Sequence, residues 1–331
     1  MVGTDAEPRL LVVTGPTASG KSDLAVALAA HLGGEVISAD AMQVYRGLDV
    51  GTAKLPLADR RGVPHHLLDV RSVDEPWHVS GWVTAARAVA RDVAGRGHWP
   101  VVCGGTPLWV AALIHGYRFA AAGADPAVRR RLTDEAEQLG PGVLHRRLGD
   151  VDPTAAAHID PGDTRRIVRA LEVFAASGQA LSAQVGRDKP ADALVVAPAW
   201  PREPLHRRIE QRVDAMLGGG WIDETVHLAA AGAAPALRRL RPVGYVPLLE
   251  WLEGHRSLAA ARADTVAATR QLAKRQLTWF RHDTAIRWLP AGPTARTEEL
   301  AGTVLLWHRE RWGQDAVPWP EDCLLTPPDQ R

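Results

Sequence analysis

The chain has 331 residues, of which 46% are hydrophobic, and its formal net charge is +1 at pH 7. This length allows one large or two modest domains, and no apolar run approaches the ~20 residues of a membrane span. Cys103 and Cys323 lie far apart in the sequence and match no metal-ligand spacing, and no secretory segment precedes the first expected strand, so we expect a cytoplasmic protein without a membrane anchor.

The first predicted elements surround a glycine-rich loop. An apolar run at 10–13 predicts a strand, and a helical pattern of apolar residues begins at Leu24. Between them, residues 15–22 match the phosphate-loop pattern G-x-x-x-x-G-K-[ST], in which backbone N–H groups and a lysine bind phosphate and a hydroxyl binds Mg²⁺. We therefore expect a di- or triphosphate at this loop, with Ser22 as the Mg²⁺ ligand. The predicted diphosphate-binding residues are Gly15, Pro16, Thr17, Ala18, Ser19, Gly20, Lys21 and Ser22.

Strand and helix patterns then alternate as far as residue 117. Such alternation is typical of a parallel sheet flanked by helices. The predicted fold is an α/β, P-loop NTPase-like core, because the phosphate loop follows the first strand. The expected elements are strands at 35–40, 66–70 and 100–103 and helices at 79–94 and 106–115.

The strand pattern disappears near Arg118 and returns near residue 194. Residues 125–187 are charged, rich in arginine and helical in pattern. Long helices are expected at about 203–217, 221–231 and 257–281, with no helical period after Trp312. We predict a core formed by 1–117 and 194–312, an all-helical insertion at 118–193 and a poorly ordered tail at 313–331.

Two further motifs follow predicted strands. Asp40 closes the second strand, and Gly104-Gly105-Thr106 follows the strand at 100–103. Ligands bind at the carboxyl ends of parallel strands, so an acid, a hydroxyl and the phosphate loop should meet in one crevice. Asp40 could cap a helix or be a surface carboxylate, but this position favours a general base or a Mg²⁺ contact. The adjacent His65 and His66 would point to opposite faces of a strand, which favours a structural or substrate-contact role over metal binding.

Arg212 falls on the border of the apolar stripe of the helix at 203–217. An arginine at the edge of a buried face needs an anionic partner. That partner could be an internal acid such as Glu250, or a phosphate in the crevice.

Two local basic clusters interrupt a chain of nearly balanced charge. One lies at 164–169, and the other comprises Arg270, Lys274, Arg275 and Arg281 beside Trp279 and Phe280. Both could be solvated surfaces, or both could contact a phosphodiester backbone. For Trp279 we favour packing in the core over stacking on a base.

From about residue 9 to about residue 290 the sequence resembles the bacterial tRNA dimethylallyltransferases, also called tRNA isopentenyltransferases. The resemblance departs at Ala41, Trp109 and Gly162, where Ser, Tyr and Asn are usual, and none of these departures removes an ionisable group. Beyond the phosphate loop, the motifs that carry it are those at 40–46, 49–54, 64–69, 104–109, 163–166, 169–173, 241–245 and 269–280.

The resemblance implies transfer of a dimethylallyl group from dimethylallyl diphosphate to N6 of adenosine 37 in the anticodon arm of tRNA, with Mg²⁺ assisting. Asp40 matches the family's base, and Thr106 and Arg212 match residues that handle the diphosphate. We further expect a monomer. The implied tRNA-binding residues are Asp40, Ala41, Met42, Gln43, Arg129, Thr164, Arg165, Arg166, Ile167, Val168, Arg241, Gly244, Tyr245, Lys274, Arg275, Gln276 and Arg281.

Two alternatives use the same core. An adenylate isopentenyltransferase would act on a free nucleotide, which needs neither the helical insertion nor the basic helix. A small-metabolite kinase or nucleotide-binding regulatory module would bind ATP at the loop. The motifs at Asp40, at 104–106 and at 269–280 argue against this second alternative. A GTPase is excluded because the chain contains no asparagine for the guanine-reading Asn-Lys-x-Asp motif.

Overall fold

The computed structural model describes residues 7–120 and 125–313. The chain forms two compact units, one comprising residues 1–114 and 191–331 and the other residues 115–190. The second unit begins and ends three residues before the helical insertion that we placed at 118–193. Most of the tail that we predicted to be poorly ordered, and Cys323 with it, lies outside the described residues.

A six-stranded sheet forms the centre of the larger unit, with the strand order β3-β2-β4-β1-β7-β8. Every pairing in it is parallel, which confirms the predicted α/β class. Strands of a parallel sheet are covered on both faces, and every residue of β1, β2 and β4 is accordingly buried. The strands are β1 (Leu10–Val13), β2 (Glu35–Ser38), β3 (His65–His66), β4 (Pro100–Cys103), β7 (Ala193–Ala199) and β8 (Ile286–Pro290).

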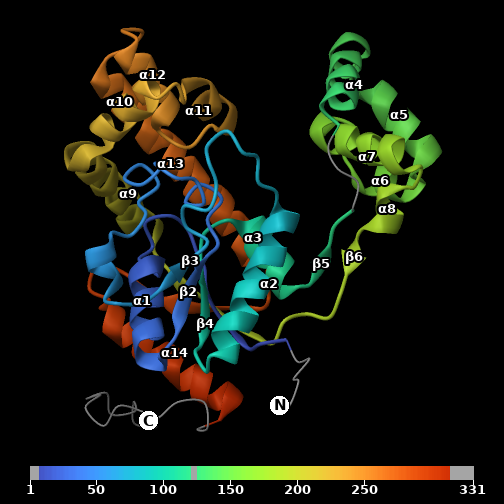
Figure 1. The fold of residues 1–331 in the computed structure, drawn as a ribbon. Coiled ribbons are helices and arrows are strands. Elements are labelled where there is room, and N and C mark those ends of the chain that lie inside the picture. The colour runs from blue at the N-terminus through green and yellow to red at the C-terminus, as the bar shows by residue number, and fades with distance from the viewer. Residues whose placement is uncertain (1–6, 121–124, 314–331) are drawn as a thin grey trace. The chain divides into compact units, whose positions relative to one another are not determined.

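Two pairs of helices flank this sheet (Figure 1). Helices α1 (Lys21–Leu32) and α14 (Thr297–Trp312) pack on each other, and Leu24, Leu28 and Leu305 join the sheet in one apolar cluster. Helices α2 (Val79–Gly95) and α3 (Pro107–Ile114) form the other pair. Among the described residues, no helix combines the length and apolar character that crossing a membrane requires.

Further helices gather beyond one edge of the sheet, above it in Figure 1. The chain turns between α9 and α10 at a run of glycines, where Gly220 has φ +102°, a conformation that side chains disfavour. This turn places Trp221 in the interior, with only 1% of its surface exposed. These elements are α9 (Arg202–Met216), η2 (Leu217–Trp221), α10 (Ile222–Ala230), α11 (Ala234–Leu240), α12 (Tyr245–Leu252) and α13 (Leu258–Arg281). A short helix, η1 (Leu57–Arg60), lies between β2 and β3 in the chain.

The smaller unit has an apolar core of its own, in which Leu132, Leu148 and Ile167 pack together. Asp125 and Asp163 cap α4 and α7 by accepting hydrogen bonds from backbone N–H groups. Its elements are β5 (Tyr117–Arg118), α4 (Pro126–Leu139), α5 (Pro141–Val151), α6 (Pro153–His158), α7 (Thr164–Ser177), α8 (Leu181–Gln184) and β6 (Gly186–Arg187).

The structure corrects three sequence predictions of secondary structure. The strand expected at 66–70 is the two-residue β3, because Leu67 and Asp69 have positive φ and cannot continue it. The smaller unit is not purely helical, since β5 and β6 pair antiparallel. The sequence analysis also missed β8, which pairs with β7 at the edge of the sheet.

Candidate active site

The phosphate loop joins β1 to α1 through backbone conformations that favour glycine. Gly15 has φ +130° and Gly20, which precedes the first turn of α1, has φ +82°. Within the described chain, no protein acceptor takes the backbone N–H groups of Gly15, Ala18 or Gly20. Free N–H groups at a helix N-terminus are suited to an anion, so the loop has the geometry that its motif predicts.

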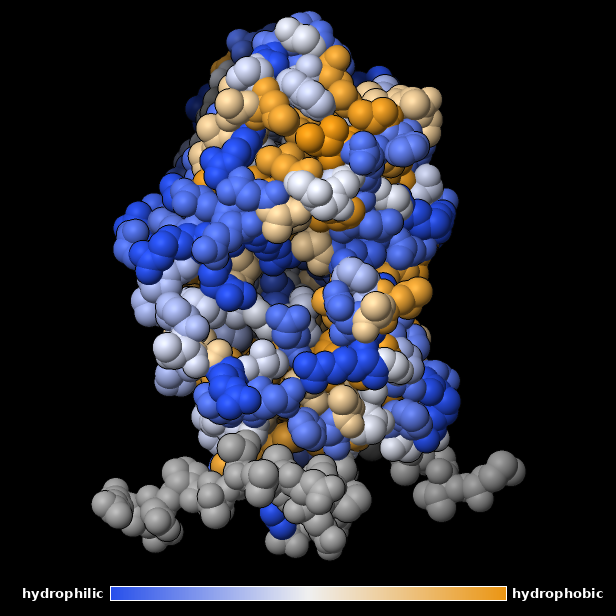
Figure 2. Space-filling model, turned by 90° about the vertical axis from the view of Figure 1, so that its left-hand side faces the viewer, coloured by the Kyte–Doolittle hydropathy of each residue, from blue (hydrophilic) through white to orange (hydrophobic). Residues whose placement is uncertain are grey.

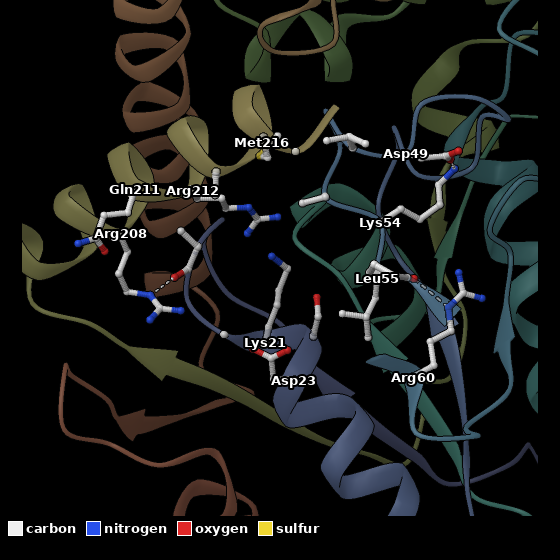
Figure 3. Close-up of a pocket in the computed structure, with 18 of the residues that line it drawn as sticks. Lys21, Asp23, Asp49, Lys54, Leu55, Arg60, Arg208, Gln211, Arg212 and Met216 are labelled. Atoms are coloured by element: carbon white, nitrogen blue, oxygen red, sulfur yellow. Dashed lines mark hydrogen bonds and ion pairs between the residues drawn. The ribbon is translucent and has the colours of Figure 1, made fainter. Parts of the chain in front are cut away.

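Two cationic side chains lie at this loop, Lys21 from the loop itself and Arg212 from α9. The Lys21 ammonium and the Arg212 guanidinium, which comes from α9, point toward one another in Figure 3. Burial lowers the pKa of both groups, and the charge of Arg212 lowers the pKa of Lys21 further. Neither forms a salt bridge with any residue that the structure describes, and Glu250 is paired with Arg256 instead. Like charges that lie together without a partner indicate a site for an anion.

Asp40 lies directly beyond the carboxyl end of β2. Its Oδ1 accepts hydrogen bonds from the N–H groups of Met42 at 2.9 Å and Gln43 at 3.4 Å. Its other carboxylate oxygen has no partner among the described residues and is available to a substrate. The capping role and the catalytic role are therefore compatible, because each uses a different oxygen atom.

Thr106 supports the chain next to Asp40. Its hydroxyl oxygen accepts a hydrogen bond of 2.9 Å from the N–H of Ala41. Thr106 lines neither of the two cavities described below, so its contact in this structure is with the backbone next to Asp40. Gly104 is required at this crossing, because a Cβ there would lie 2.2 Å from the carbonyl oxygen of Ala39.

Two cavities meet at Lys21 and Arg212. The larger has a volume of about 810 Å³ and also contains Arg208, Arg60 and Lys54 (Figure 3). Figure 2 shows that the face on which α1 and α9 lie in Figure 1 is hollowed near its middle. The smaller, of about 130 Å³, contains Asp40 together with the apolar side chains of Ile209 and Val213. Lys21, Ser22, Arg212 and Met216 line both cavities.

The sequence analysis missed Glu224, which fixes the loop at 49–51. The Glu224 carboxylate accepts hydrogen bonds from three successive N–H groups of this loop, at 2.9, 2.6 and 3.1 Å. It also accepts a hydrogen bond from the Tyr245 hydroxyl at 2.5 Å, and burial and the Glu224 charge raise the pKa of Tyr245. Within the same loop, Lys54 donates to Asp49 and Asp69. The sequence shows that Glu224 lies at the start of a helix, but it does not show that this carboxylate binds the distant loop at 49–51.

We expect Glu224→Ala to reduce the free energy of unfolding by about 1–3 kcal/mol, because three loop N–H groups lose their acceptor. Urea unfolding of the purified variant measures this change. The matched control is Glu203→Ala, which removes an exposed carboxylate from the first turn of α9. Equal losses in the two variants would show that Glu224 does not hold the loop.

Several residues that we predicted to bind tRNA have buried side chains. Gln276 is 6% exposed, and Tyr245 is fully buried against Glu224. Ile167 and Val168 belong to the core of the smaller unit, and Gly244 packs on Trp221. These residues therefore expose little side-chain surface, which the helical pattern of the sequence did not show, and their contact with tRNA stays a prediction.

The remaining predicted tRNA-binding residues differ in their exposure. Arg129 pairs with the buried Glu172 at 2.7 Å, and Arg166 pairs with Asp163 at 3.4 Å. Gln43 donates to backbone carbonyls of the neighbouring loop. Thr164, Ala41 and Met42 are half-buried, whereas Arg165, Arg241, Lys274, Arg275 and Arg281 are exposed.

Three aromatic residues and one arginine that the sequence analysis named have the following surroundings in the structure. Trp279 leaves 46% of its surface exposed, so the preferred prediction that it packs in the core is wrong, and Phe280, 3% exposed, packs there instead. Arg270 pairs with Glu210 on α9 and joins two helices. Trp109, one of the departures from the family pattern, is buried and stacks on Trp82 at 4.9 Å.

The paired histidines and the cysteine contact protein groups. His65 Nδ1 lies 2.9 Å from the carbonyl oxygen of Val63, and His66 Nε2 lies 2.6 Å from Glu35. Hydrogen bonds from Arg96 and His66 hold the pKa of Glu35 at about 2 in spite of its burial. Burial raises the pKa of the Cys103 thiol to about 11, so this cysteine remains protonated.

Comparison with known proteins extends these observations. A family model described as IPP transferase matches residues 43–283. A tRNA dimethylallyltransferase of Pelotomaculum thermopropionicum is 44% identical over 88% of this chain and 94% of its own length. A second, from Streptomyces coelicolor, is 45% identical over 88% of this chain and 93% of its own.

Solved structures show the same likeness. The tRNA isopentenylpyrophosphate transferase of Bacillus halodurans has 34% identity and a TM-score of 0.67, and the match covers 92% of this chain and 98% of that one. A eukaryotic dimethylallyltransferase, described as acting on tRNA, has 27% identity and a TM-score of 0.77 over 95% of this chain and 81% of its own. Because the family model spans more than half of the chain and these relatives align along most of it, the chain belongs to the IPP transferase family.

Proposed function

We propose that this protein transfers the dimethylallyl group of dimethylallyl diphosphate to N6 of adenosine 37 in tRNA and releases diphosphate. The observation that carries the proposal is that Lys21 and Arg212, which have no salt-bridge partner among the described residues, and the Asp40 carboxylate, which has one free oxygen, line one small cavity. The names of the matched relatives, tRNA dimethylallyltransferase, support the same activity.

In this mechanism the diphosphate binds at the phosphate loop, where Lys21, Arg212 and backbone N–H groups stabilise the negative charge that grows as it leaves. The bond from N6 to C1 of the dimethylallyl group forms while the C1–O bond breaks. Asp40 accepts the proton from N6, because the amine of adenine is a weak nucleophile whose lone pair is delocalised into the ring. The apolar side chains of Ile209, Val213 and Leu272 line the same cavity and suit a five-carbon chain.

The residues present fit a Mg²⁺ ion, which prefers oxygen ligands. The Ser22 hydroxyl and the Asp40 carboxylate both line the smaller cavity beside Lys21. The Ser22 hydroxyl would hold the ion, and the free oxygen of Asp40 is left to accept the proton from N6. When bound, Mg²⁺ would neutralise part of the diphosphate charge.

The adenine must leave its base stack to reach this cavity, as base-modifying enzymes require. Within the proposal, the exposed cations at 165–166 and on α13 bind phosphates of the anticodon arm. The half-exposed Trp279 is then available to stack on an unpaired base. We expect the protein to act as a monomer in the cytoplasm.

Labelled dimethylallyl diphosphate tests this proposal directly. Unmodified tRNA, AMP and buffer are compared as acceptors, and nucleoside analysis of the recovered tRNA identifies the product. Labelled N6-dimethylallyladenosine from tRNA alone is the expected result. Labelling of AMP would indicate an adenylate isopentenyltransferase, and consumption of ATP in place of the prenyl donor would indicate a kinase.

We expect Arg165→Ala/Arg166→Ala and Lys274→Ala/Arg275→Ala to weaken tRNA binding without changing the affinity for dimethylallyl diphosphate. Each lost phosphate contact should reduce the salt slope of log K by about 0.7–0.9. A salt titration of tRNA affinity measures the slopes for both pairs. The control is Arg207→Ala, which removes an exposed cation from α9. Slopes equal to the wild-type value would show that these cations do not contact the RNA backbone.

A further inference from the structure

Gln276 connects three segments that are distant in the sequence. It lies on α13, and its Oε1 accepts a hydrogen bond of 2.8 Å from the N–H of Thr17 in the phosphate loop. Its Nε2 donates a hydrogen bond of 2.7 Å to the carbonyl oxygen of Gly105. Only 6% of Gln276 is exposed, and it lines the smaller cavity with Lys21 and Asp40. Both ends of one amide are therefore used to hold the two backbone segments that border the site.

The two bonds require a side chain that both accepts and donates. A glutamate in the same position could still accept from Thr17, but its second oxygen would face the carbonyl oxygen of Gly105 without a proton to share. A methionine of similar length would leave both backbone groups without partners in a buried place. Glutamine is thus the side chain whose chemistry matches both backbone partners.

The position of Gln276 on α13 separates it from the surface. Its neighbours Lys274 and Arg275 are exposed, whereas Ala273 packs with Ala18, Leu205 and Ile209 beside the phosphate loop. The inner face of α13 therefore lies against the diphosphate site, and Gln276 supplies hydrogen bonds from that face. A hypothetical Cβ at Gly105 would lie 2.6 Å from Gln276 Nε2 and 3.4 Å from the Lys21 Cε atom, so Gly105 lies close to Lys21 as well.

We propose that Gln276 is a positioning residue for the diphosphate, which fixes the phosphate loop at Thr17 and the segment at Gly105 in the spacing that the donor requires. The proposal rests on the proposed function of this site. It differs from the contact with tRNA that we first expected of Gln276, because it predicts an effect on the donor and none on the affinity for RNA.

Two substitutions at this position separate the possible roles. Gln276→Glu keeps the shape of the side chain and the acceptor for Thr17 but loses the donor to Gly105, and Gln276→Met removes both bonds without adding charge. Each variant should raise the KM for dimethylallyl diphosphate and the Kd of inorganic pyrophosphate by on the order of tenfold, with a much smaller change in kcat. The Kd of tRNA should stay within about twofold of the wild-type value.

The controls are Gln271→Glu and Gln271→Met, which make the same changes at an exposed position of the same helix. They should leave the KM for the donor and the Kd of pyrophosphate unchanged. Thermal melting of every variant, with and without pyrophosphate, reports folding separately from ligand binding. A purely structural role would lower the melting temperature while the folded variants bind pyrophosphate normally.

Three results would overturn the proposal. They are pyrophosphate affinity at the wild-type level in both Gln276 variants, a loss of tRNA affinity as large as the loss of donor affinity, or an unfolded Gln276→Met protein beside a Gln276→Glu protein that binds the donor normally. Wild-type protein that labels no tRNA would instead contradict the proposed function. In that case the Kd of pyrophosphate in the Gln276 variants would still show whether Gln276 positions the phosphate loop.

Discussion

Asp40→Asn should lower the rate of dimethylallyl transfer by about 10²–10⁴-fold, the usual contribution of a general base. The asparagine side chain keeps an oxygen that can accept the hydrogen bonds from Met42 and Gln43, so the turn after β2 should persist. The variant loses only the ability to take the proton from N6. Single-turnover kinetics with saturating donor and tRNA measure the chemical step.

The affinity of this variant for tRNA should remain near the wild-type value, because the substitution removes no exposed cation. Asp59→Asn is the control, since Asp59 is an exposed carboxylate on η1. It should transfer the dimethylallyl group at the wild-type rate. An Asp40→Asn protein that kept more than about half of the wild-type rate would show that another group accepts the proton.

Lys21→Met should abolish tight binding of the donor and reduce the rate by about 10²–10³-fold, as the loss of an oxyanion ligand does. The same change should stabilise the protein in the absence of ligand. Burial and Arg212 lower the pKa of Lys21 in the folded protein, so the charged form destabilises the fold at every pH below that pKa. This cost is present at neutral pH, begins to shrink as the pH rises past the folded-state pKa, and is gone only above the ordinary lysine pKa of 10.5 that applies in the unfolded chain. Removing the charge removes the cost.

Thermal melting with and without dimethylallyl diphosphate measures both effects. The free variant should melt at a higher temperature than the wild type, and the donor should no longer raise its melting temperature. Lys189→Met, at an exposed lysine, is the control and should change neither value. A lower melting temperature for free Lys21→Met would show that Lys21 has a stabilising partner in the folded protein.

Arg212→Met should reduce kcat more than it raises the KM for the donor, because its guanidinium faces the growing charge of the leaving diphosphate. Unchanged steady-state kinetics would contradict this role. The ion pair with Glu250 offers no alternative explanation, since Glu250 is bound by Arg256.

The sequence by itself determined the phosphate loop, the parallel α/β core and Asp40 at the end of a strand. These features depend on contiguous residues, because a loop motif, an apolar strand and a helical period can each be recognised within a short segment of sequence. The alternation of strands and helices then limits the sheet to a parallel arrangement, and parallel strands bring their carboxyl ends to one edge. The position of Asp40 beside the phosphate loop follows from that rule.

Only the tertiary structure decided which residues of a helix turn inward. Trp279 and Phe280 are neighbours on α13, yet one is half-exposed and the other is in the core. Gln276 lies next to the exposed Arg275 but binds the phosphate loop. The helical period gives the angle between side chains and leaves open which face meets the sheet, since that choice depends on the packing of distant apolar residues.

The partners of charged groups were likewise invisible in the sequence. Glu224 binds the loop at 49–51, and Lys21 and Arg212 face one another without a salt bridge within the described chain. Electrostatic and hydrogen-bond energies depend on distances through space and on burial, and neither quantity can be read from separation along the chain. The fold brings α9, α10 and α13 to the carboxyl edge of the sheet, and this arrangement turns separate motifs into one site.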